Sequence, residues 1–160
     1  YTEIKKINGK KYYYRVLSVR TGKKVSKKRK YLGIDLNKED LSTKEMVADK
    51  ELVANTVSKE IERIKNKIKN ILKKNKVKRA GIFGSYARGE QKDNSDIDIL
   101  VEIDDKEMSL LKFINFKNKL EEILKSKVDL VEYKLVRPEI KENIFSEEIR
   151  IIWKETIGCL

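Results

Sequence analysis

Histidine is absent from the 160 residues, and cysteine and proline each occur once. Without histidine the chain cannot use a Ser-His or Cys-His pair, and it lacks the ligand of the commonest zinc sites. A single cysteine, Cys159, cannot build a disulfide framework. Because oxidising compartments favour disulfides, this composition predicts a cytoplasmic protein.

Long apolar runs are also missing. None approaches the ~20 residues that a membrane-spanning helix needs, and the start of the chain does not have the pattern of a signal peptide. We therefore expect no membrane partner. Apolar residues nevertheless make up 39% of the chain, which is enough for a packed core. The length suits one compact domain with a modest extension.

Positive charge is concentrated at one end of the chain. Residues 1–36 contain 12 Lys and Arg against 2 Asp and Glu, a net charge of +10, whereas residues 37–160 contain 26 against 24, a net charge of +2. A basic extension on a nearly neutral body suggests a polyanionic partner, either a nucleic acid or an acidic protein. The alternative, a general surplus of surface lysine, explains the body better than it explains residues 1–36.

Residues 1–36 have the pattern of a small β-meander. Asn8-Gly9 suits a tight hairpin turn, a second turn is expected at Thr21-Gly22, and polar and apolar residues alternate through 12–19 as in a strand. Tyr12, Tyr13 and Tyr14 lie among lysines, so they can stack on bases or cover one face of a small sheet. The sheet interpretation is favoured.

Residues 37–57 have the composition of a polar connector, partly helical, in which Ser42 and Thr43 are candidate N-caps. Residues 58–160 form the remaining domain. Their pattern predicts a helix from Ser58, strands over 77–83, 97–103 and 128–133, and a helix with apolar residues at Leu110, Leu111, Ile114, Leu120, Ile123 and Leu124.

The end of this domain is predicted to be one more helix. Pro138 suits its first turn, and Ile140, Ile144, Ile149 and Ile152 would form its inner face. Trp153 is expected to seal the core.

Three aspartates are the strongest sign of chemistry. Asp96 and Asp98 are two residues apart, so on a strand they share one face. Asp129 lies in an otherwise apolar strand and would complete a cluster if the two strands are neighbours. Carboxylates this close repel one another unless a cation lies between them, and oxygen ligands of this kind suit Mg²⁺. Such a cluster can hold two metal ions and support in-line displacement at phosphorus.

A glycine-bounded loop, Gly84-Ser85-Tyr86-Ala87-Arg88-Gly89, precedes the aspartate pair. Gly84 permits close approach of the backbone to a ligand, and Ser85 offers an amide and a hydroxyl that can bind a triphosphate. Arg88 can add positive charge near the phosphates or the acceptor. The loop is not a Walker A motif, because no Gly-Lys-Ser/Thr follows at the required spacing.

Residues 84–102, GSYARGEQKDNSDIDILVE, resemble the signature of the polymerase-β-like nucleotidyltransferase superfamily, and the fuller string resembles its minimal nucleotidyltransferase (MNT) subgroup. The resemblance covers roughly residues 58–153 and includes the segment VRPEIKENI. It implies a mixed α/β fold, with a short mixed sheet packed by helices. It also implies that Gly84 and Ser85 bind the triphosphate, and that Asp96, Asp98 and Asp129 bind two magnesium ions.

MNT proteins are commonly paired with a HEPN-domain ribonuclease as antitoxin and toxin. The resemblance therefore implies an ATP- and Mg²⁺-dependent enzyme that transfers AMP to a hydroxyl of a HEPN partner. Two alternatives stay open. The same chemistry can act on RNA or a small molecule, or the chain can be a non-catalytic adaptor for nucleic acid or protein. All three aspartates are present, which favours catalysis.

Overall fold

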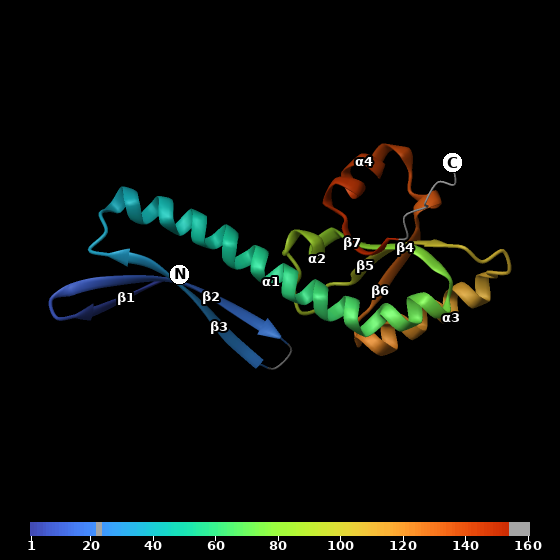
Figure 1. The fold of residues 1–160 in the computed structure, drawn as a ribbon, viewed down its shortest axis with the longest axis horizontal. Helices are drawn as coiled ribbons and strands as arrows, with labels where there is room; N and C mark the ends of the chain where they lie inside the picture. The colour runs from blue at the N-terminus through green and yellow to red at the C-terminus, as the bar shows by residue number, and fades with distance from the viewer. Residues whose placement is uncertain (22–23, 154–160) are drawn as a thin grey trace, which may run out of the picture. The chain divides into compact units, whose positions relative to one another are not determined.

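The computed structural model describes residues 1–21 and 24–153. Gly22 of the expected second turn and Cys159 lie outside these ranges. The chain divides into two compact units, Tyr1–Thr56 and Val57–Leu160. The elements (Figure 1) follow in the order β1 Thr2–Ile7, β2 Lys10–Thr21, β3 Lys24–Ile34, α1 Lys38–Lys74, β4 Val77–Phe83, α2 Gly84–Arg88, β5 Ile97–Ile103, α3 Leu110–Leu124, β6 Val128–Glu132, a 3₁₀ turn Tyr133–Leu135, α4 Pro138–Glu147 and β7 Ile149–Trp153.

The first unit contains the predicted β-meander. Strands β1, β2 and β3 form an antiparallel sheet in chain order. Asn8 and Gly9, with φ angles of 49° and 77°, connect β1 to β2. Positive φ at both central residues is what a two-residue hairpin turn of this hand requires, so the expected Asn-Gly turn is confirmed.

Helix α1 is longer than the sequence pattern predicts, since it is continuous for 37 residues. The Asn37 side chain accepts a hydrogen bond from the Asp40 amide at 2.8 Å and so fills the role expected of Ser42 or Thr43. Both of those residues lie inside the helix. The segment 37–57 is therefore helical from Lys38 onward, and the division between the two units falls within α1.

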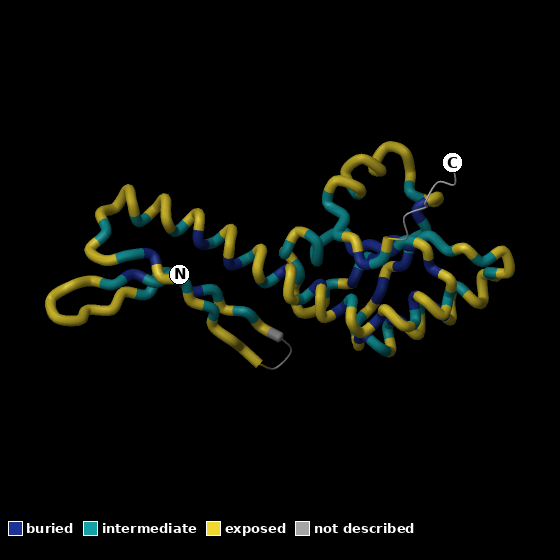
Figure 2. Tube along the Cα trace, in the orientation of Figure 1, coloured by how far each residue is buried: buried dark blue, intermediate teal, exposed yellow. Residues whose placement is uncertain are grey.

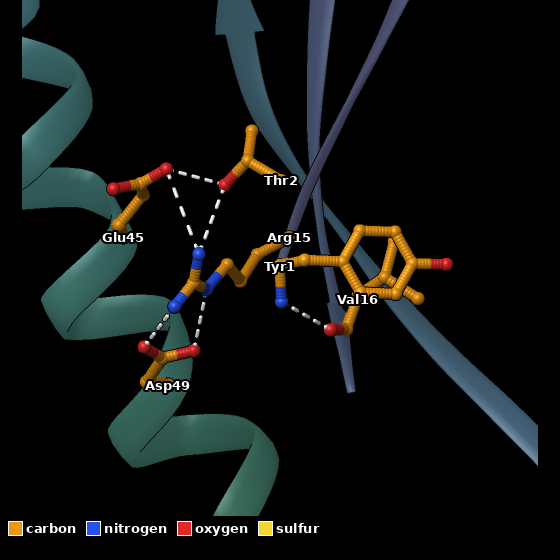
Figure 3. Close-up of polar contacts among 6 residues, drawn as sticks. All are labelled: Tyr1, Thr2, Arg15, Val16, Glu45 and Asp49. Carbon is orange, nitrogen blue, oxygen red and sulfur yellow. Dashed lines mark hydrogen bonds and ion pairs between the residues drawn. The ribbon is translucent and has the colours of Figure 1, made fainter. Parts of the chain in front are cut away.

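One face of the first sheet packs against the beginning of α1. Tyr13, Leu32 and Ala48 form its buried cluster. Beside them Arg15 makes two hydrogen bonds of 2.7 Å to the Asp49 carboxylate and one of 3.1 Å to Thr2, as Figure 3 shows. This pairing holds the pKa of Asp49 below its ordinary value, chiefly through the hydrogen bond. Charge pairing as well as apolar contact thus joins the sheet to the helix.

The second unit is built on a four-stranded sheet of order β6-β5-β4-β7. Strand β5 runs parallel to β6 and antiparallel to β4, and β4 runs antiparallel to β7. In Figure 1, α3 and the later part of α1 lie on one side of this sheet and α4 on the other. The predicted mixed α/β fold, with a short mixed sheet packed by helices after a β-meander, is confirmed.

The core of the second unit lies between this sheet and its helices (Figure 2). The largest fully buried side chains come from α1, β4, β5 and α3: Ile68, Leu72, Val77, Ile82, Ile99, Leu100, Val101 and Leu120. Leu110 and Leu111 were expected in the apolar stripe of α3, but they are 76% and 73% exposed. Phe116 supplies buried surface there instead.

The prediction that the last helix continues beyond Glu147 is wrong. Helix α4 ends there, and Ile149 and Ile152 belong to strand β7, which pairs with β4. A strand forms here because pairing with β4 satisfies the backbone groups of both strands. Trp153 does not seal the core, because it is 37% exposed and its ring lies under the guanidinium of Arg150 at 3.9 Å.

In the ranges that the structure covers, no helix has the length and apolar character of a membrane span.

Candidate active site

Asp98 is the centre of the site because its strand lies between two others. In the sheet register Asp98 is opposite Phe83 of β4 on one side and Asp129 of β6 on the other. The strands that carry Asp98 and Asp129 are thus neighbours, as predicted, and the two residues are directly opposite each other in the sheet. The start of the parallel pair is fixed by a hydrogen bond of 2.9 Å from the Ile97 amide to the Lys127 carbonyl.

Asp96 precedes β5 rather than lying within it. It follows a turn in which the Ser95 hydroxyl accepts a hydrogen bond from the Lys92 amide at 2.8 Å. The side chains of Asp96 and Asp129 are exposed, and that of Asp98 is half-buried. The site therefore faces solvent with its most buried carboxylate at the base.

The electrostatics of Asp98 reflect this arrangement. Its pKa is raised to about 6, first by burial and then by the negative charges of Asp129 and Asp96, while Arg88 acts in the opposite direction. Asp96 and Asp129 are therefore both close enough to act on the Asp98 carboxylate. In residues 1–21 and 24–153, however, no three acidic or cysteine side chains are arranged closely enough to hold a metal ion as they stand.

The donor set nevertheless fits Mg²⁺. It consists of carboxylate oxygens, which this cation prefers, and a bound cation would relieve the repulsion that raises the Asp98 pKa. Asp96 and Asp129 are exposed and free to turn toward such an ion.

Gly84 lies directly against Asp98. Its φ is +68°, and a Cβ atom at this position would stand 2.2 Å from an Asp98 carboxylate oxygen. Only glycine combines this backbone conformation with this close approach. Gly84 begins α2, so the expected loop is a one-turn helix that ends at Gly89, where φ is 73°. Ser85 and Arg88 both belong to this turn.

Arg88 is held by two carboxylates. Its Nε donates to Glu90 at 2.8 Å, and its Nη1 donates to Glu147 at 2.8 Å. The other oxygen of Glu147 accepts a hydrogen bond from the Gly84 amide at 3.2 Å. A carboxylate from α4 thus binds the Gly84 amide and the Arg88 guanidinium, both from residues predicted to bind phosphate.

Glu147 and its neighbour Glu148 have no distinguishing pattern in the sequence. Glu148 accepts a hydrogen bond from the Tyr133 hydroxyl and lies where a Cβ atom at Gly81 would be, and burial raises its pKa. The Glu147-Glu148 pair resembles any surface pair in a lysine- and glutamate-rich chain. Its importance depends on the α4–β7 connection, which the sequence pattern did not predict.

The chain is similar to proteins that are named adenylyltransferases. A Methanocaldococcus jannaschii protein named "putative protein adenylyltransferase" is 49% identical over 92 residues, which are 58% of this chain and 98% of that protein. The protein adenylyltransferase MntA of Thermococcus cleftensis is 41% identical over 75 residues, 47% of this chain and 75% of its own length.

A crystal structure of a toxin–antitoxin with AMP-PNP matches with a TM-score of 0.51 and 30% identity over 57% of this chain and 74% of that one. The family model "Polymerase beta, Nucleotidyltransferase" matches residues 66–157, more than half of the chain. Because this model covers most of the chain, the chain belongs to the polymerase β nucleotidyltransferase family.

Proposed function

We propose that the chain is a Mg²⁺-dependent protein adenylyltransferase that transfers AMP from ATP to a hydroxyl of a HEPN-type toxin and so acts as its antitoxin. The observation that carries the chemistry is the placement of Asp98, in register with Asp129 and against Gly84. The relatives named as adenylyltransferases support AMP as the transferred group. The toxin–antitoxin structure supports a toxin as the partner.

In this proposal Asp96, Asp98 and Asp129 hold two magnesium ions, which lower the cost of negative charge on the reacting oxygens. The Gly84 amide, Ser85 and Arg88 bind the triphosphate. An acceptor hydroxyl oxygen attacks the α-phosphorus of ATP, and the bond from this phosphorus to the bridging oxygen of the β-phosphate breaks. Pyrophosphate leaves with that bridging oxygen, and the hydroxyl proton passes to water.

The direct test uses α-³²P-labelled ATP with Mg²⁺ and two separate acceptors, a HEPN-domain toxin from the same source and total RNA. We expect label on the HEPN protein, and we expect no label with an Asp96→Asn, Asp98→Asn double variant. Label on RNA alone would replace the protein acceptor in the proposal while leaving the chemistry intact. No label on either, together with no binding of ATP, would contradict catalysis and favour the adaptor.

Glu147 gives a second prediction. Because its carboxylate contacts the Gly84 amide and Arg88, a triphosphate entering the site must displace it. Glu147→Gln keeps a hydrogen-bond acceptor but removes the charge. One repulsive pair at ~4 Å in water corresponds to about 1 kcal/mol, so we expect AMP-PNP to bind about fivefold more tightly in a calorimetric titration.

The matched control is Glu139→Gln, which makes the same change in the exposed first turn of α4. It should leave the affinity for AMP-PNP unchanged. If Glu147→Gln bound AMP-PNP more weakly than the parent chain, Glu147 would be part of the binding site rather than its competitor.

A further inference from the structure

The first sheet has two chemically different faces. Along β3, Lys28 donates to Thr56 of α1 at 2.8 Å and Lys30 forms an ion pair with Glu51 of α1. Arg15 of β2 is bound to Asp49. Side chains alternate along a strand. Lys27, Arg29 and Tyr31, which alternate with Lys28 and Lys30 along β3, therefore project from the face that α1 does not cover.

We call this second face the open face of the sheet. The register places residues of all three strands on it: Glu3, Lys5 and Ile7 of β1, Lys10, Tyr12, Tyr14, Val16, Ser18 and Arg20 of β2, and Val25, Lys27, Arg29 and Tyr31 of β3. Val16, at the middle of this face, is buried by its neighbours. Ring contacts agree with this placement, because the Tyr14 and Tyr31 rings lie 5.4 Å apart and the Lys5 ammonium lies 5.5 Å from the Tyr14 ring.

Charge is separated between the two faces. The acidic residues of α1 that reach the sheet, Glu45, Asp49 and Glu51, all contact cations of the covered face. On the open face, within the described residues of β1 to β3, Glu3 is the one acidic side chain, and it is bound to Arg29 at 2.9 Å. Lys5 and Lys27 leave this face positively charged.

Aromatic rings on the open face are accessible among these cations. Tyr31 is 51% exposed and Tyr1, whose ring is contacted by Lys27 at 5.8 Å, is 57% exposed. By contrast, Tyr13 is buried against α1. The three consecutive tyrosines therefore lie on different faces of the sheet. Tyr13 packs in the core against α1, and Tyr12 and Tyr14 lie on the open face.

We propose that the open face binds single-stranded nucleic acid, with bases stacked on Tyr14 and Tyr31 and the phosphates near Lys5 and Lys27. Exposed rings and basic side chains on one surface are the elements of sequence-tolerant binding to single strands. Charge complementarity favours a polyanion over a neutral partner, and the rings favour a partner that has flat apolar surfaces of its own. An acidic peptide would use the charge but leave the rings without a role.

The test is fluorescence anisotropy of a labelled 20-nucleotide RNA titrated with the full chain at 50 and 200 mM salt. The charge variant is Lys5→Glu with Lys27→Glu, which leaves the Arg29–Glu3 pair intact. It should weaken binding at least tenfold and lower the slope of log K against log salt by about two, one for each lost phosphate contact. The control is Lys67→Glu with Lys69→Glu, the same charge change on exposed positions of α1, which should alter affinity less than twofold.

A second variant, Tyr31→Leu, keeps an apolar side chain in the sheet but removes the ring. Loss of one stacked base should weaken binding about fivefold or more without changing the salt slope. Circular dichroism verifies that each variant is folded. Equal binding by the charge variant and its control would overturn the proposal. So would tighter binding to a duplex of the same sequence, or complete competition by polyglutamate at equal charge concentration.

Discussion

Replacing Asp98 with asparagine is expected to abolish AMP transfer and at the same time to stabilise the metal-free protein above pH 6. Even outer-shell partners of a metal typically change metal affinity or activity by about 10- to 100-fold, so we expect a loss of more than about 100-fold for a direct ligand. Transfer of labelled AMP measures the first effect.

The stability effect follows from the sign of the pKa shift. The Asp98 pKa is about 6 in the folded chain against 3.8 ordinarily, so the unfolded chain ionises first as the pH rises. Folding stability is therefore lost between about pH 4 and pH 6. Asparagine carries no charge, so Asp98→Asn should melt at a higher temperature than the parent at pH 8, and this advantage should vanish near pH 4.

Magnesium should reverse the order of the two melting temperatures at pH 8, so that the parent chain melts above Asp98→Asn. A ligand that binds only the folded state raises its stability by RT ln(1 + [L]/Kd), so Mg²⁺ should raise the melting temperature of the parent chain and not that of Asp98→Asn. Asp104→Asn is the control, since Asp104 is exposed and follows the other end of β5. A parent chain whose melting temperature did not respond to Mg²⁺, with transfer still intact in Asp98→Asn, would remove Asp98 from the metal site.

Gly84→Ala should have the next largest effect. An alanine at φ +68° costs roughly 1–2 kcal/mol from backbone strain alone. Its methyl group would also stand 2.2 Å from the Asp98 carboxylate, which must move. A displacement of about 1 Å at a reacting site can cost on the order of 100-fold in rate, so we expect at least that loss in AMP transfer.

Gly9→Ala separates strain from crowding. Gly9 has a similar φ of +77°, and no atom lies within 4 Å of a Cβ added there. It should lower stability by the strain cost only and leave transfer unchanged. If Gly84→Ala retained full activity with only a comparable loss of stability, close contact between Gly84 and Asp98 would be unimportant for the reaction.

The sequence predicts secondary structure best where the apolar residues recur with the period of the element that forms. Strands 77–83 and 97–103 and the Asn8-Gly9 turn could be predicted because alternation and turn chemistry are local properties. The start of α1 could not be predicted, since Met46 and Val47 are 62% and 51% exposed and the contacts of this segment with the sheet include ion pairs between residues far apart in the chain.

The candidate site divides in the same way. Asp96, Asp98 and Asp129 could be chosen from residue type and spacing, and the strands that carry Asp98 and Asp129 are neighbours. The roles of these aspartates stay a prediction, as do those of Gly84, Ser85 and Arg88. Glu147 could not have been found, because its contact with Gly84 joins residues 63 positions apart through a chain turn that resembled a continuing helix.

The shared level of Asp98 and Asp129 limits how the chain can change in length. Strand β6 has Val128 and Leu130 buried, with Asp129 exposed between them. A single inserted residue within this strand would turn its apolar residues to solvent and move the carboxylate to the opposite side. Selection for a packed core therefore also preserves the alignment of the aspartates. Insertions should be tolerated in the connections, such as 104–109, because neither the packing of the core nor the alignment of the aspartates depends on strand alternation there.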